Sequence, residues 1–422
     1  MAVSAQGLVG IALIPFIAWL VSEQRGCLPL TERLRLVGVT LAIQLALALL
    51  LLKMPWTRIL FDAIGSGVAA LEHATDAGMQ MVFGYLAGGP APFEIKSPQN
   101  AFLLAFRGLP LILVLSALVQ LLYYWGVLQR LVGAVAALLR KATGTGGPLG
   151  TIAASSMFLG LVEAPLLVRP YIRTMSRPAL FAAMVVTMST IAGTVLALYA
   201  TILQSAIPGA AGHLLAGSLM NVPAALMLAR LTMPETDPLQ AHASAEIHLE
   251  NAPQSSMDAI AMGTIEGIKL LSTVIAMLVV MVSLVALANS LLGAALQPFG
   301  VTATFQQLLG YACAPLAWII GIPASEAATA GSLLGQKLVL NELIAYLDLT
   351  RMPDGELSAR SRVILTYAMC SFANLGSLGI QVGALTAMAP ERRSEIVALA
   401  PRAMALGFLA TLLSAAIIGL IA

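Results

Sequence analysis

The sequence predicts an all-α integral membrane protein with eight transmembrane helices, two opposed re-entrant hairpins and interfacial helices. Three observations carry this prediction. Of the 422 residues, 59% are hydrophobic and only 10% are charged, whereas a soluble domain carries roughly 25% charged residues. Apolar runs of about 20 residues, long enough to cross a bilayer, recur along the chain. Two further apolar stretches contain glycine, proline and an acidic residue, which a simple span avoids.

Eight full-length spans are expected from the apolar runs. They lie near residues 5–21, 34–52, 101–125, 179–203, 213–229, 268–292, 363–388 and 403–422. Glycines within the fourth and seventh of these spans allow local unwinding, and unwound carbonyls can bind a cation.

Three segments between the spans differ from them. In residues 57–86, acidic residues and a histidine interrupt an apolar stripe, which predicts an amphipathic helix lying in the membrane interface. Residues 127–141 are expected to form a second interfacial helix. Residues 231–257 contain three prolines and no sustained apolar period, which predicts a polar linker.

The two remaining apolar stretches, residues 146–175 and 303–346, are predicted to be re-entrant hairpins. The first places Glu163 inside an apolar run, two residues before Pro165. A charge at membrane depth is costly and therefore indicates function. The second contains Glu342, and its polar pair Ser325-Glu326 is where a hairpin could turn.

The positions of lysine and arginine support this topology, because cytoplasmic loops carry the excess of positive charge. No Lys or Arg precedes residue 21, so the N-terminus is expected outside, and the C-terminus ends outside as well. The scheme requires that neither hairpin crosses the membrane, so the hairpins open from opposite sides as an inverted pair. Only three arginines oppose the rule, namely Arg351, Arg360 and Arg362.

The chain is expected to divide into five parts. These are N-terminal spans (1–56), interfacial and scaffold helices (57–145), the first hairpin with its broken helix (146–212), scaffold helices with the linker (213–302), and the second hairpin, broken helix and last span (303–422). The hairpin parts would form a transport domain.

Composition argues against several function classes. A net charge of +2 and the lack of a basic patch argue against nucleic-acid binding. The three cysteines are scattered and have no metal-ligand spacing, and the start of the chain has no basic signal-peptide region. An intramembrane enzyme is disfavoured because no nucleophile–base pair is found, and the paired hairpins argue against a channel. No cofactor is expected.

Polar side chains at membrane depth concentrate in the two hairpins and in the fourth and seventh spans. Serine and threonine in such helices often bond back to their own helix. Asn374 and Glu342 are harder to explain structurally, because an unpaired amide or carboxylate in an apolar setting is costly. For Lys337 a structural pairing and a functional role both remain open.

At these residues the chain resembles a concentrative nucleoside transporter. The motifs are Gly160-Leu-Val-Glu-Ala-Pro, Ser189-Thr-Ile-Ala-Gly-Thr, Gly335-Gln-Lys-Leu-Val-Leu-Asn-Glu and Ser371-Phe-Ala-Asn-Leu-Gly-Ser. The resemblance implies a homotrimer in the bacterial inner membrane that moves a transport domain like an elevator. It implies an ion-coupled symporter for nucleosides. The alternative is a carrier of the same fold for a solute with an apolar or unusual base.

The resemblance also assigns roles to individual residues. It implies that Glu342, Asn374 and Ser377 hold the ribose, with Phe372 and Val195 packed near the ligand. Sequence departures from the family occur in the first hairpin, where the base-contacting positions are the apolar residues Leu161 and Val162, followed by Glu163.

The resemblance further implies a sodium site at Ser156, Leu159, Thr190 and Ile191. Ser156 stands where the family has asparagine, which shortens one ligand arm and weakens the site. A proton needs only an acid, and Glu163 in its apolar hairpin is a candidate carrier. The sequence therefore favours proton over sodium coupling, with Glu163 as the carrier, and leaves a weakened sodium site as the alternative.

Overall fold

The computed structural model describes residues 2–95, 103–235, 253–300 and 303–421. Most of the expected linker (residues 236–252), the first two residues of the expected third span and the last residue of the chain lie outside these ranges. The described chain is helical, apart from one isolated β-bridge between Asp354 and Leu357.

The N-terminal third follows the expected order. It consists of α1 (Ala2–Leu20), α2 (Leu30–Lys53), α3 (Pro55–Phe83), a 3₁₀ turn at Gly84–Ala87, α4 (Leu104–Arg107), α5 (Leu111–Tyr124) and α6 (Val127–Thr143). The expected interfacial helices correspond to α3 and α6. The third span is not one helix, because Pro110 lacks an N–H group and separates α4 from α5.

Two segments of similar design follow. The first comprises α7 (Gly147–Ser155), α8 (Glu163–Leu166), α9 (Arg169–Ile172), α10 (Arg177–Ser189), α11 (Gly193–Leu203) and α12 (Ala210–Thr232). The second comprises α14 (Phe305–Ile319), α15 (Ala327–Val339), α16 (Glu342–Arg351), α17 (Ala359–Met369), α18 (Leu375–Met388), a 3₁₀ turn at Pro390–Arg392 and α19 (Arg393–Ile421). Each contains a hairpin, a broken helix and an unbroken helix.

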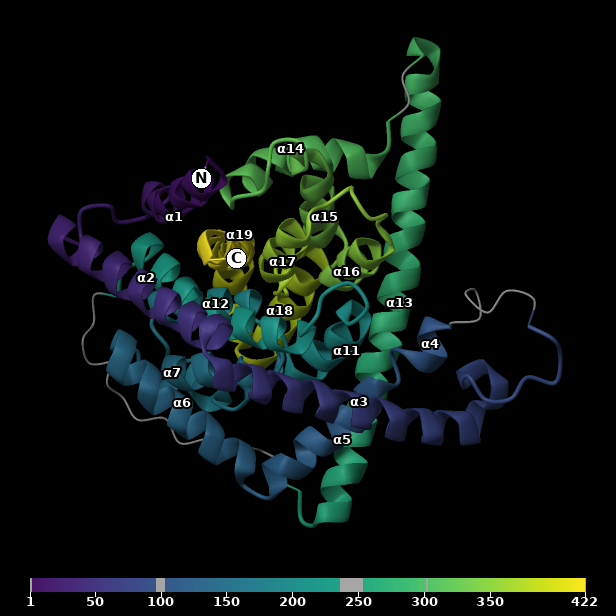
Figure 1. Ribbon diagram of the computed structural model, residues 1–422. Helices are drawn as coiled ribbons and strands as arrows, with labels where there is room; N and C mark the ends of the chain where they lie inside the picture. Colours follow the sequence, from purple (N-terminus) through teal and green to yellow (C-terminus); the bar gives the residue numbers. More distant parts are fainter. Residues whose placement is uncertain (1, 96–102, 236–252, 301–302, 422) are drawn as a thin grey trace.

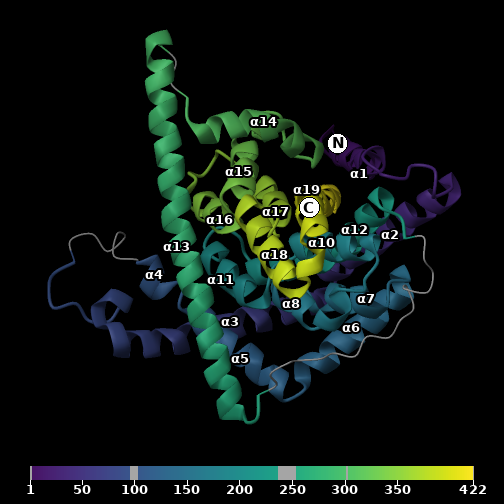
Figure 2. The same cartoon turned by 180° about the vertical axis from the view of Figure 1, so that it is seen from behind.

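Between the two segments lies α13 (Ser256–Leu296), followed by a 3₁₀ turn at Gln297–Phe299. The expected span at 268–292 covers only part of this helix of 41 residues, which is about 60 Å long at 1.5 Å per residue. It stands as a rod at one side of the molecule, beyond the central short helices (Figures 1 and 2).

The expected eight spans agree with the helices. Six described segments are long and apolar enough to cross a membrane, at Leu30–Leu52, Leu104–Tyr124, Arg177–Leu203, Ala210–Thr232, Ser256–Phe299 and Pro390–Ile421. The shorter apolar helices Gln6–Leu20 and Leu375–Met388 supply the other two positions. The fourth and seventh spans are broken, at Thr190–Ala192 and at Cys370–Asn374.

The second hairpin differs from the expectation. The range 303–346 holds three helices, and the chain reverses near Ser325 and again at Leu340–Asn341. The second reversal, between α15 and α16, is the counterpart of the first hairpin's tip. The predicted turn at Ser325-Glu326 is present between α14 and α15, whereas the reversal at Leu340–Asn341 was not predicted. The tip at Leu340–Asn341 forms because the Asn341 side chain caps α16 by accepting from the N–H of Ile344 at 3.0 Å.

α12 contacts helices from several of the expected parts. It packs against α10, α11 and α19 and also against α1 and α2, and the division of the chain into scaffold and transport parts stays a prediction. α13 packs mainly on α5. This contact is close at Gly263, where a Cβ atom would meet the backbone of Ser116 and Ala117.

Charged groups from distant segments meet at one end of the molecule. Glu23 pairs with Arg177 at 3.2 Å and also with Arg402, so the loop after α1, the start of α10 and the first half of α19 lie together. The membrane topology predicted from the sequence places both termini at the same end of the molecule. In agreement, Gly7 of α1 lies against Ala416 and Leu420 of α19. Their placement outside the cell stays a prediction.

Candidate functional site

One cavity of about 300 Å³ lies where the two hairpin tips, the two helix breaks and the α5–α13 pair meet. All eight residues predicted to contact the solute line it: Leu161, Val162, Glu163, Val195, Glu342, Phe372, Asn374 and Ser377. The ion-site candidate Leu159 lines it too, whereas Ser156, Thr190 and Ile191 lie behind the lining in the buried interior.

The first hairpin presents an apolar tip and one carboxylate. α7 ends at Ser155, and the chain turns through Leu161 and Val162 into α8, whose first residue is Glu163. The Glu163 carboxylate folds back over Gly160, where any Cβ atom would collide with it. A glycine is therefore required at residue 160 if Glu163 is to keep this position.

The second hairpin holds its carboxylate between two donors. Tyr199 of α11 donates its hydroxyl to Oε1 of Glu342 at 2.7 Å, and Asn374 donates its side-chain amide to Oε2 at 3.0 Å. The side-chain oxygen Oδ1 of Asn374 accepts from the backbone N–H of Ser377 at 2.7 Å, and this hydrogen bond caps α18. Glu342 is 3% exposed, so these contacts fix its orientation beside the cavity.

Lys337 has a structural pairing, although not with a glutamate. Its ammonium donates to the Ser371 hydroxyl and to the Ala373 carbonyl, each at 2.8 Å, and lies 4.8 Å from the centre of the Phe408 ring. The side chain is fully buried. It therefore joins α15 to the break between α17 and α18 and to α19.

Asn221 of α12 connects the two helix breaks to each other. Its side-chain amide donates to the carbonyls of Ser189 and Cys370, each at 2.9 Å. These carbonyls belong to the ends of α10 and α17, where helix hydrogen bonding stops. The sequence analysis missed Asn221, because its partners lie 32 and 149 residues away.

The ion-site candidates lie at a junction of two helix C-termini. The N–H of Gly193 donates to the carbonyl of Phe158 at 2.9 Å, which holds the break after α10 against the turn after α7. Ser156 and Thr190 donate their hydroxyls to carbonyls of their own helices, at 3.0 and 3.3 Å. Their oxygen lone pairs remain available, and the C-terminus of a helix carries partial negative charge.

The wall opposite the hairpins contains polar residues that the sequence analysis missed. They are Ser116, Gln120, Tyr123, Glu266 and Thr273, all on α5 or α13. Tyr199 was missed as well, although it lies one helical turn after Val195, a spacing that places both on one face. Among the described residues that line the cavity there is no Lys, Arg or His, but there are three glutamates.

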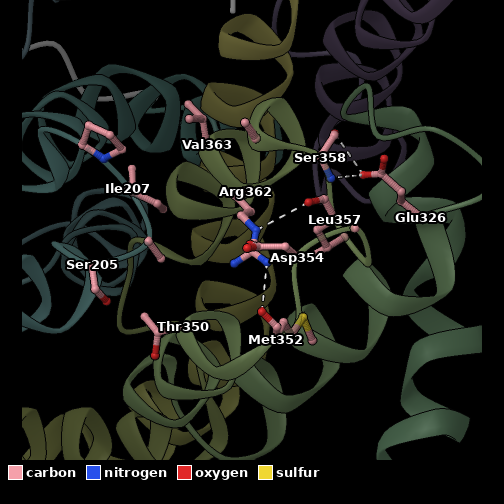
Figure 3. Close-up of a pocket in the computed structure, with 14 residues that line it drawn as sticks. Ser205, Ile207, Glu326, Thr350, Met352, Asp354, Leu357, Ser358, Arg362 and Val363 are labelled. Atoms are coloured by element: carbon pink, nitrogen blue, oxygen red, sulfur yellow. Dashed lines mark hydrogen bonds between the residues drawn. The ribbon is translucent and has the colours of Figure 1, made fainter.

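A larger cavity of about 780 Å³ lies at the far ends of α11 and α16 (Figure 3). It contains none of the predicted site residues. Its Arg362 donates to the carbonyls of Leu349, Met352 and Pro353 at 3.0–3.1 Å, and Glu326 accepts from Ser358.

Two of the three arginines that oppose the positive-inside rule, Arg360 and Arg362, have local hydrogen-bond partners in this region. Arg362 and Arg360, which donates to the Gly321 carbonyl at 2.7 Å, both satisfy backbone carbonyls at helix ends. Their positions therefore follow from local hydrogen bonding rather than from the positive-inside rule.

Comparison with known families covers most of the chain. Residues 213–419 match the family described as Na⁺ dependent nucleoside transporter C-terminus, and residues 9–86 match the corresponding N-terminus. Residues 105–206 match a family described as nucleoside recognition, or Gate.

Individual relatives agree with these matches. The chain is 33% identical over 419 residues to the nucleoside permease NupC of Helicobacter pylori, covering 98% of this chain and 96% of that protein. It is 32% identical over 401 residues to human solute carrier family 28 member 3, covering 90% of this chain and 55% of that protein.

Solved structures show the same fold. CNTnw in an inward-facing substrate-bound state superposes with a TM-score of 0.88 at 36% identity, covering 99% of this chain and 97% of that one. A double variant of CNTnw in an outward-facing state gives a TM-score of 0.90 at 37% identity, with the same coverage. The chain is therefore a multi-pass membrane transporter, not an enzyme, and belongs to the concentrative nucleoside transporter family.

Proposed function

We propose that this protein imports nucleosides across the bacterial inner membrane by sodium-coupled elevator transport. The observation that carries the proposal is the Glu342–Asn374 pair, held by Tyr199 at the edge of an acidic cavity. A carboxylate and an amide side by side offer both an acceptor and a donor, which suits the vicinal hydroxyl groups of a ribose.

The charge of the cavity favours an uncharged nucleoside over a nucleotide. Three glutamates and no basic residue lie among the described lining residues. A phosphate group would be repelled there, because like charges in a partly desolvated site interact strongly.

The base would lie against the first hairpin. Leu161 and Val162 line the cavity with Val195 and Phe372, and these side chains offer apolar contact without directional hydrogen bonds. The alternative solute, a molecule with an apolar or unusual base in place of a common nucleobase, follows from the same observation.

Sodium is the coupling ion that the combined observations favour, rather than a proton. The matching family is described as Na⁺ dependent. The C-termini of α7 and α10 converge at Ser156, Leu159, Thr190 and Ile191, where hydroxyl and carbonyl oxygens can surround a cation. Protonation of Glu163 is the second candidate, supported by its position at an apolar hairpin tip beside the cavity.

The proposal includes an elevator mechanism, a homotrimer and termini outside the cell. CNTnw, whose fold this chain shares, is known in inward-facing, outward-facing and intermediate states. The long helix α13 exposes apolar side chains such as Val279, Leu287 and Leu291, which are available for contacts with lipid or with other copies.

Counterflow in proteoliposomes tests the proposal. Vesicles preloaded with unlabelled uridine, adenosine or cytidine should accumulate the labelled nucleoside, and Glu342→Gln and Asn374→Ala should each abolish this accumulation. Thr350→Ala is the matched control, since Thr350 lies at the other end of α16 and bonds its own helix. Normal counterflow by the Glu342 and Asn374 variants would remove the assignment of the ribose site.

A further inference from the structure

Helix α6 runs along the outside of the molecule, with α7 on its inner side (Figures 1 and 2). One face of α6 packs inward, where Leu128, Val132 and Leu139 are buried. These residues are four and seven positions apart, a spacing that places them on the same side of a helix. The rest of the helix surface is free of this packing and has two further faces.

The second face of α6 is apolar but exposed. Val127, Leu131 and Leu138 again lie four and seven positions apart, and all three are exposed, Leu138 to 66%. Just before the helix, Trp125 donates its indole N–H to the Ser256 hydroxyl of α13 at 3.2 Å, which fixes this end. A helix with an exposed apolar stripe beside a polar face is typical of the membrane interface, where the stripe lies among acyl chains.

The third face of α6 carries positive charge that the protein does not neutralise. The helix contains Arg130, Arg140 and Lys141 and no acidic residue. All three basic residues are exposed, and within the described ranges none of them takes part in an ion pair.

The rotation of the helix separates these basic residues into two groups. Arg130 and Lys141 are eleven residues apart, which is close to three full turns, so they lie on one side at a separation of about 16 Å along the axis. At about 100° per residue they border the exposed apolar stripe, about 70° from its centre, whereas Arg140 points about 160° away from it. Long basic side chains beside an apolar stripe extend toward the headgroup region of a bilayer.

We propose that Arg130 and Lys141, together with the stripe of Val127, Leu131 and Leu138, form a binding site for anionic phospholipid, of which phosphatidylglycerol is an example. The stripe takes the acyl chains. The guanidinium and the ammonium take the phosphate groups, because charge-assisted hydrogen bonds to phosphate are strong. Charge complementarity commits the site to an anionic lipid, since no carboxylate on α6 competes for the two cations.

The site lies at the entrance to the first hairpin. α6 ends at Thr143, and Gly144, with a φ of 71°, turns the chain so that α7 begins at Gly147. The Thr143 carbonyl accepts from the Arg230 guanidinium of α12 at 3.0 Å, which holds this end in place. A lipid bound along α6 is therefore attached to the helix that leads directly into the hairpin.

Thermal unfolding of the purified protein in detergent tests the proposal, because a ligand of the folded state raises stability. Phosphatidylglycerol should raise the melting temperature more than phosphatidylcholine with the same acyl chains. Arg130→Gln and Lys141→Gln should each raise the phosphatidylglycerol concentration for half-maximal stabilisation about fivefold, the contribution of one basic residue near an anionic surface, and the double variant about 25-fold. The response to phosphatidylcholine should not change.

Arg140→Gln is the matched control, since it removes the same charge from the opposite side of the same helix. It should keep the phosphatidylglycerol response of the unaltered protein. A double variant with an unaltered response, or an Arg140→Gln protein with the same loss as the double variant, would overturn the proposal.

Two further measurements exclude other occupants of this face. Glycerol 3-phosphate has the headgroup phosphate without acyl chains and should not stabilise the protein, and stabilisation by it would indicate a soluble anion instead of a lipid. Light scattering should give the same oligomeric mass for the unaltered protein and the double variant, and a change in mass would assign the face to contacts between copies. Since none of these measurements depends on uptake, their failure leaves the proposed transport function untouched.

Discussion

The Tyr199 hydroxyl and the Asn374 amide hold opposite oxygens of the same carboxylate, that of Glu342, at 2.7 and 3.0 Å. Tyr199 comes from the first broken helix and Asn374 from the second. The carboxylate that would bind the solute is therefore oriented by both halves of the protein before any solute enters. Such preorganisation lowers the entropic cost of binding.

Removing the Tyr199 hydroxyl should weaken solute binding without unfolding the protein. We expect Tyr199→Phe to raise the KM for uptake by about tenfold, since hydrogen bonds to charged groups contribute roughly 1.5–3 kcal/mol and 1.4 kcal/mol is a factor of ten. Tyr346→Phe is the matched control. Its ring lies 5.2 Å from that of Tyr199, but its hydroxyl donates to the Thr366 carbonyl. Equal KM values for both variants would argue against a role for Tyr199 in binding.

Base selectivity should be poor in the unaltered protein and should sharpen when polar groups are introduced. Apolar contacts discriminate only about 10–200-fold, whereas a site that hydrogen-bonds its ligand can discriminate by 10⁴-fold or more. We expect the double change Leu161→Gln with Val162→Thr to widen the difference between uridine and adenosine in competition assays. An unaltered protein that already separates the two by several hundredfold would contradict this.

Substitution of two neighbouring serines, Ser155 and Ser156, tests whether sodium is the coupling ion. Ser155 and Ser156 are both fully buried and both donate to carbonyls of α7, but only Ser156 is a proposed sodium ligand. Ser156→Ala should raise the sodium concentration for half-maximal uptake several-fold, and Ser155→Ala should leave it unchanged.

The opposing test asks whether a proton is the coupling ion. It measures uptake into proteoliposomes under an imposed pH gradient in the absence of sodium. Accumulation under these conditions, lost in Glu163→Gln, would assign the coupling to a proton on Glu163 instead of to sodium.

Asn221 should contribute to stability through its two acceptors. Asn221→Ala leaves the carbonyls of Ser189 and Cys370 without this donor, and an unsatisfied buried polar group costs about 1–3 kcal/mol. We expect a fall in the apparent melting temperature in detergent. The fall should be smaller than two unsatisfied carbonyls alone would cause, because the substitution also removes the Asn221 side-chain oxygen, which has no hydrogen-bond partner among the described residues. Ser218 is the control on the same helix, because its buried hydroxyl has no hydrogen-bond partner among the described residues. A Ser218→Ala protein that is destabilised as much as Asn221→Ala would refute the assignment.

The sequence determined the class of protein and the positions of the eight spans, and its resemblance to a known family pointed to eight of the residues that line the cavity. Hydropathy reports the transfer of each segment into the bilayer, which depends on local composition alone. Glu163, Glu342 and Asn374 could be identified for the same reason, since polar groups at membrane depth are costly wherever they occur.

Only the tertiary structure decided which groups pair with these residues. Lys337 bonds Ser371 and Ala373 rather than a glutamate, and Tyr199 reaches Glu342 across 143 residues of sequence. The range of the second hairpin turns at Leu340–Asn341 in addition to the turn predicted near Ser325. Glu266 and Gln120 reach the cavity from a wall built by two other helices. Hydrogen bonds of this kind depend on how separate segments pack, and the periodicity of a single segment carries no information about its distant partners.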